Sequence, residues 1–163
     1  MSEQNSLNAK LEESIKEIFI GDTLKNVLEF VQHLGMLGMA HKGSLNDGKF
    51  VYKDKNVCYT YFGNSSNSPG YPEPWTVWMS GGFGTENECV PFDDRMKEIV
   101  WGNVHKCDEN CPHINKGCSK QRVLFGQSFD KLCQTPIGFT DPNAEETECM
   151  KRLMEMLKRS IDK

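Results

Sequence analysis

The spacing of apolar residues changes twice along the chain, and this pattern restricts the fold more than any other feature. Residues 7–19 and 24–34 carry apolar side chains at intervals of three and four, as on one face of an α-helix. In the segments 50–53, 57–62 and 75–80 the pattern changes to a period of two, with side chains alternating between two faces, which is typical of β-strands. Helical spacing returns at 92–100 and 145–161. This order predicts an α+β fold, an antiparallel sheet of about four to five strands with helices packed on one face and a Cys-rich loop insert.

Turn and capping residues set the expected boundaries of these elements. Residues 54–56 are expected to connect two strands as a β-hairpin. Asp22 and Asp141 are expected to cap the second and the last helix, with Pro142 at the first helical position of the latter. Two further short strands are expected at 121–125 and 136–139.

Length and composition predict one globular domain over residues 1–163, in which 105–133 is a Cys-rich segment. Hydrophobic residues make up 37% of the chain and charged residues 26%, enough apolar content for a core. The net charge of −4 argues against a general nucleic-acid binder, which normally carries a basic excess. No apolar run approaches the roughly 18 residues of a membrane span, and residues 1–6 do not resemble a signal peptide. We therefore expect a cytoplasmic protein with no membrane partner.

Four cysteines are spaced as metal ligands. Three residues separate Cys107 from Cys111, six separate Cys111 from Cys118, and fourteen lead on to Cys133. The first pair fits the knuckle spacing of zinc sites, and the fold would supply the later ligands. Ile114 is the only aliphatic residue between Cys107 and Cys118, so this loop lacks apolar anchors and a metal crosslink would give it one structure. Zinc is therefore the expected cofactor, with His105 and His113 as substitute ligands.

Other interpretations of the seven cysteines stay open. Cys111-Pro112 resembles the end of some iron–sulfur motifs, although the remaining spacing differs from common ferredoxin patterns. A redox-active thiol pair, or a solvated loop with independent thiols, also fits the sequence. Cys58 and Cys149 are expected in the core, because one alternates within a strand and the other borders a helical stripe. Cys89 is left undecided.

Aromatic residues form a second candidate site. Tyr59, Tyr61, Trp75 and Trp78 lie on two expected strands beside the polar loop 63–74. If helices leave one face of the sheet uncovered, these rings could bind an apolar or cationic small molecule. The alternative is that they belong to the core. No catalytic motif stands out elsewhere: Cys107 with His105 and Cys111 with His113 are close in sequence, and such neighbours in a loop rarely form the oriented dyad that nucleophilic catalysis needs.

The C-terminal third resembles a group of uncharacterised small bacterial proteins. The resemblance rests on the spaced cysteines, the stretch Leu124–Phe129, Cys133 and the helix start at Asp141-Pro142. It implies that Cys133 belongs with the upstream cysteines, and it implies no activity. We therefore expect a non-enzymatic, metal-binding protein that acts in binding or regulation. The alternatives are a small iron–sulfur or thiol redox protein and a metal-free small-molecule binding module. Nucleic acid is not an expected partner, and the oligomeric state stays open.

Overall fold

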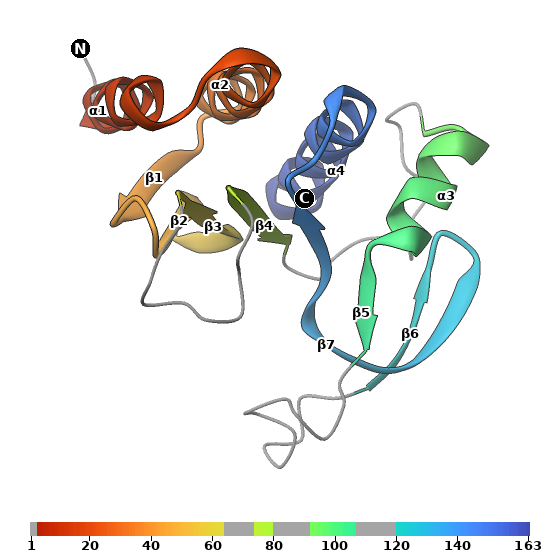
Figure 1. The fold of residues 1–163 in the computed structure, drawn as a ribbon. Coiled ribbons are helices and arrows are strands. Elements are labelled where there is room, and N and C mark those ends of the chain that lie inside the picture. The colour runs from red at the N-terminus through yellow and green to blue at the C-terminus, as the bar shows by residue number, and fades with distance from the viewer. Residues whose placement is uncertain (1–2, 64–73, 80–91, 107–119) are drawn as a thin grey trace.

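The computed structural model describes residues 3–63, 74–79, 92–106 and 120–163. Two helices begin the chain, a β-rich region interrupted by one helix follows, and a long helix ends it (Figure 1). The elements are α1 (Glu3–Ile18), α2 (Gly21–Met36), β1 (Ala40–Gly43), β2 (Gly48–Tyr52), β3 (Lys55–Phe62), β4 (Trp75–Met79), α3 (Asp94–Gly102), β5 (Val104–Lys106), β6 (Lys120–Leu124), β7 (Gln127–Thr140) and α4 (Ala144–Asp162).

The described strands form an antiparallel sheet in the order β1-β2-β3-β4-β7-β5, with β6 paired to β7 away from this path. The α+β class is confirmed, but the described residues alone form seven strands rather than the expected four or five. The additional strands are short: β1 has four residues and β5 has three. Segments of this length contain too few residues to show an alternating pattern, so sequence periodicity does not reveal them.

Helices α1, α2 and α4 lie along one face of the sheet, with α3 beside α4 (Figure 1). The core between the layers is apolar and aromatic. Trp75, Phe62 and Phe139 of the sheet are fully buried, as are Phe30 of α2 and Leu153 of α4. The helical stripes predicted from the sequence therefore form the second layer of a two-layer fold.

Two expected helix caps are wrong. The residue before α2 is Ile20, which makes no side-chain capping hydrogen bond, and Asp22 lies inside the first turn. At α4 the cap is Asn143, whose Oδ1 accepts from the Glu146 backbone N–H at 2.8 Å. Asp141 is still tied to the sheet, because its N–H donates to the Trp75 carbonyl at 2.8 Å, so the helix begins only after it. An Asn three residues before a Glu is itself a capping signal.

A buried amide fastens α1 to the edge strand of the sheet. Asn8 is 6% exposed. Its Nδ2 donates to the Met39 carbonyl at 3.0 Å, and its Oδ1 accepts from the His41 N–H at 3.1 Å. The side chain thus pairs with backbone groups at the start of β1, which among the described strands pairs only with β2. This contact fixes the distance between α1 and β1.

Within the described ranges, no helix has a stretch that is both long and apolar enough to cross a membrane.

Candidate functional site

The strands next to the cysteine segment meet at one residue of β7. Lys106, the last residue of β5, pairs with Leu132 of β7, and Lys120, the first residue of β6, pairs with the same Leu132. In an antiparallel ladder a residue has one neighbour on each side, so β5 and β6 flank β7 at this level. Two strand spacings put the backbones of Lys106 and Lys120 about 10 Å apart.

Cys133 directly follows Leu132 and lies in β7, although its side chain is outside the described part of the structure. The other three expected ligands, Cys107, Cys111 and Cys118, fall between residues 107 and 119, also outside it, as does His113. Among residues 3–63, 74–79, 92–106 and 120–163, no group of three or more His, Cys, Asp or Glu side chains could hold a metal ion. Any site built from these cysteines therefore depends on residues that the structure does not describe.

Two cysteines lie in the core, as expected from the sequence. Cys58 of β3 and Cys149 of α4 are both fully buried and form no disulfide. Burial raises the pKa of each thiol to about 12. Because the thiolate is the reactive form, the raised pKa values favour the neutral thiol, and these two side chains pack as small apolar residues.

The structure separates the four aromatic residues that we expected at one ligand site. Tyr59 pairs with Trp78 across β3 and β4, and Tyr61 pairs with Thr76, so these rings share the face away from the helices. Trp75 points to the opposite face. It is fully buried, with its ring centroid 6.1 Å from those of Phe30 and Phe62. Trp75 is therefore a core residue, and only the other three remain together.

Trp78 rests on a glycine of the neighbouring strand. It pairs with Gly138 of β7, and a Cβ placed on Gly138 would lie 2.6 Å from Cζ3 of the Trp78 ring. The His105 ring meets the same indole edge-on, with the centroids 4.7 Å apart, and its Nε2 is 3.2 Å from the Gly138 carbonyl. The indole of Trp78 therefore lies between the backbone of Gly138, which has no side chain, and the imidazole ring of His105. His105, whose sequence position near the cysteines suggested a substitute metal ligand, takes part in this aromatic contact.

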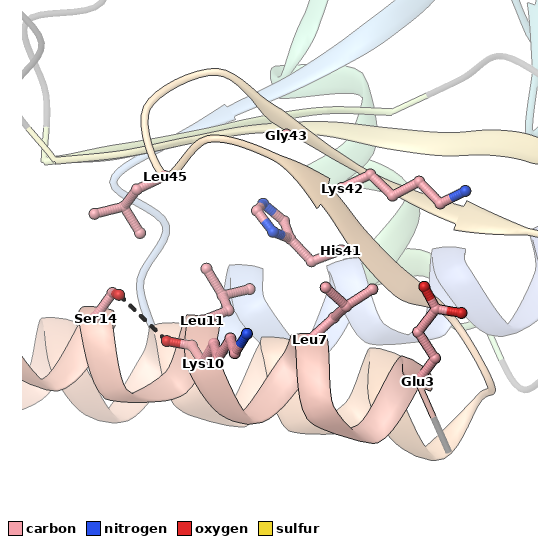
Figure 2. A pocket seen from close by; sticks show the side chains of 9 residues that line it. All are labelled: Glu3, Leu7, Lys10, Leu11, Ser14, His41, Lys42, Gly43 and Leu45. Carbon is pink, nitrogen blue, oxygen red and sulfur yellow. Dashed lines mark hydrogen bonds between the residues drawn. The ribbon is translucent and has the colours of Figure 1, made fainter.

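A hollow that the sequence did not predict lies between α1 and the β1–β2 hairpin (Figure 2). Its volume is about 470 Å³. Leucine side chains and the buried His41 line it, with charged residues at its margin: Glu3, Leu7, Lys10, Leu11, Ser14, His41, Lys42, Gly43 and Leu45. No sequence pattern indicated this hollow. Strand β1 was not predicted, and the sequence therefore did not show that His41 faces α1.

Comparisons with protein-family models, with curated proteins and with solved structures give no match to this chain.

Proposed function

We propose that this chain is a cytoplasmic zinc-binding protein in which Cys107, Cys111, Cys118 and Cys133 hold one structural zinc ion, and that it acts in binding or regulation rather than catalysis. One observation carries the proposal. Lys106 and Lys120, which bound the cysteine segment, both pair with Leu132, the residue before Cys133.

This register matters for a shared site because three of the cysteines lie within two residues of the paired positions. Cys107 follows Lys106 directly, Cys118 precedes Lys120 by two residues, and Cys133 follows Leu132. Consecutive Cα atoms are about 3.8 Å apart, which limits how far each cysteine can be from this level of β7. The register of the sheet therefore supports the convergence of Cys107, Cys118 and Cys133, three of the four ligands of the proposed tetrahedral site.

The ligand chemistry favours a structural site. Four thiolates around zinc leave no open position for a substrate, and such sites contribute to folding. A reducing cytoplasm keeps the thiols available for metal. The two core cysteines do not compete for the ion, because burial raises their pKa values to about 12.

Metal content tests the proposal. The chain is purified under reducing, oxygen-free conditions and examined by mass spectrometry for metal and by visible absorbance. We expect about one zinc per chain, lost in Cys118→Ser and Cys133→Ser and retained in Cys89→Ser, the matched control. Iron with visible absorbance would replace the zinc proposal with the iron–sulfur alternative. No metal, or equal loss in all three variants, would overturn it.

A second function is favoured by the three rings on the sheet face away from the helices. Tyr59, Tyr61 and Trp78 are partly exposed there and could bind an apolar or cationic small molecule. Titration with tetramethylammonium, followed by tryptophan fluorescence, tests this function. The response should disappear in Tyr61→Ala and persist in Tyr52→Phe, because Tyr52 packs near Lys158 of α4 on the other side of the sheet. No response in the unmodified protein would remove this candidate.

A further inference from the structure

A row of directly paired residues crosses the sheet on the face away from the helices. Lys42 of β1 pairs with Lys49 of β2, Lys49 with Tyr59 of β3, Tyr59 with Trp78 of β4, and Trp78 with Gly138 of β7. Directly paired residues of an antiparallel sheet point to the same face. His41, the neighbour of Lys42, faces α1 (Figure 2), so Lys42 and the rest of the row face the other way. Two lysines and two aromatic rings are therefore neighbours on one face.

The two lysines lie directly opposite each other. Side chains at such a position have Cβ atoms about 4.5–5.5 Å apart, and like charges there destabilise the sheet. Neither Lys42 nor Lys49 forms an ion pair with any residue in the described ranges. Lys42 is exposed and Lys49 is partly exposed. An anion bound between the two ammonium groups would relieve their repulsion.

The charge of this part of the sheet is opposite in sign to that of the whole chain. Strands β1, β2, β3 and β4 contain no aspartate and no glutamate, and their lysines are Lys42, Lys49 and Lys55. The net charge of the chain is −4. The lysine pair therefore forms a local positive site on an acidic protein, which complements a ligand with a small negative group.

The rings beside the lysines are held in place by their neighbours. The Tyr59 hydroxyl accepts a hydrogen bond from Asn56 Nδ2 at 3.3 Å. The Trp78 ring lies over Gly138, with the His105 ring edge-on against it. Both Tyr59 and Trp78 are partly exposed, so part of each ring can be contacted from solvent. Side chains that are oriented before binding lose little conformational entropy when a planar ligand stacks on them.

We propose that this face binds a planar anion, a nucleoside monophosphate, with its base stacked on Tyr59 and Trp78 and its phosphate paired with Lys42 and Lys49. Two strand spacings, about 10 Å, separate Lys42 from Tyr59 along the row. The acidic net charge favours a single nucleotide over a nucleic-acid strand, whose many phosphates it would repel. The inference rests on the rings of the second candidate function, differs from it in the charge of the ligand, and does not involve the zinc site.

Titration with adenosine monophosphate, followed by isothermal calorimetry, tests the proposal. Adenosine lacks the phosphate and inorganic phosphate lacks the ring, so we expect both to bind more weakly than the nucleotide. Nucleotide binding should weaken as the salt concentration rises. Lys42→Ala and Lys49→Ala should each weaken it by up to about fivefold, since an exposed ion pair contributes up to about 1 kcal/mol. Lys25→Ala, on the exposed surface of α2, is the matched control and should leave it unchanged.

A second pair of variants tests the stacking. Tyr59→Leu removes the ring but keeps an apolar side chain on β3, and it should weaken nucleotide binding by about fivefold or more, because stacking of a base on an aromatic ring contributes about 1–3 kcal/mol. Tyr59→Phe keeps the ring and should bind the nucleotide as the unmodified chain does. Circular dichroism shows whether each variant is folded.

Four results would overturn the proposal. The first is equal binding of adenosine and adenosine monophosphate, and the second is an equal effect of Tyr59→Leu and Tyr59→Phe. The third is binding of single-stranded oligodeoxyadenylate without binding of the nucleotide, which would assign the face to nucleic acid. The fourth is a response to tetramethylammonium with none to the nucleotide, which would leave the second candidate function in place.

Discussion

Replacing Gly138 with alanine tests how tightly the sheet is packed beneath Trp78. The new Cβ would lie 2.6, 2.7 and 2.9 Å from Cζ3, Cε3 and Cη2 of the indole. Carbon atoms in contact are normally about 3.5–4.0 Å apart, so ring and strand must separate by about 1 Å. The Trp78 ring has little room to move away from Gly138, because the His105 ring contacts it edge-on with a centroid distance of 4.7 Å.

The expected cost follows from this overlap. Overpacking a well-packed site costs about 1–3 kcal/mol, and each kcal/mol lowers the Tm of a chain of this size by about 2–4 °C. Gly138→Ala should therefore lower the free energy of unfolding by about 1–3 kcal/mol. Urea denaturation followed by circular dichroism and tryptophan fluorescence gives this quantity. Gly102→Ala is the matched control, because no atom lies within 4 Å of its Cβ position at the end of α3. It should be neutral or stabilising by up to about 1 kcal/mol, since alanine favours a helix over glycine.

A double variant separates the clash from a general effect on the strand. In the Trp78→Leu background the large ring is absent, so Gly138→Ala should cost less than in the unmodified chain. The difference between the two costs is the coupling of neighbouring residues, expected at about 0.5–3 kcal/mol. Equal costs in both backgrounds, or a cost of Gly138→Ala no larger than that of Gly102→Ala, would refute the reasoning.

Three other predictions follow from single contacts. Asn8→Ala removes both hydrogen bonds to β1 and should lower the free energy of unfolding, measured by urea denaturation, by about 2–4 kcal/mol. A loss no larger than that caused by a substitution at an exposed site would contradict this role. Cys58 and Cys149, with pKa values raised to about 12 by burial, should react with a thiol reagent only after unfolding, and labelling of either in the native protein would show that it is accessible. Burial lowers the pKa values of His33 and His41 below 6.5, so the unfolded chain binds more protons just below pH 6.5 and stability should fall as the pH decreases through that window. Ring titrations by nuclear magnetic resonance check this directly, and a native pKa above 6.5 for either residue would contradict it.

Long periodic segments were predictable from the sequence, and short or tertiary features were not. Helix α4 has 19 residues and strand β3 has eight, enough for a period to show. The hairpin of β2 and β3 was also predicted, but its turn was expected at 54–56 and lies instead at Lys53 and Asp54, which have positive φ values of 48° and 63°. The strand β1 was missed because its pairing depends on β2 and on the Asn8 side chain rather than on an apolar pattern.

The candidate sites show the same difference between what a local sequence pattern predicts and what tertiary contacts decide. Residue types and spacing in the sequence predicted the four cysteine ligands, and that prediction still awaits its test. The sequence also indicated the aromatic residues, yet it could not determine that Trp75 packs on Phe30 while Tyr59 and Trp78 share the other face, because strand pairing decides which rings meet.

By itself, the sequence determined the α+β class, the long helices and the burial of Cys58 and Cys149, because these follow from the local order of apolar and polar residues. Tertiary structure alone decided that Lys106 and Lys120 both pair with Leu132, that Trp78 lies over Gly138, and that His41 faces α1. These contacts join residues far apart in the chain, and their geometry depends on register and on packing between layers, which a local pattern does not encode.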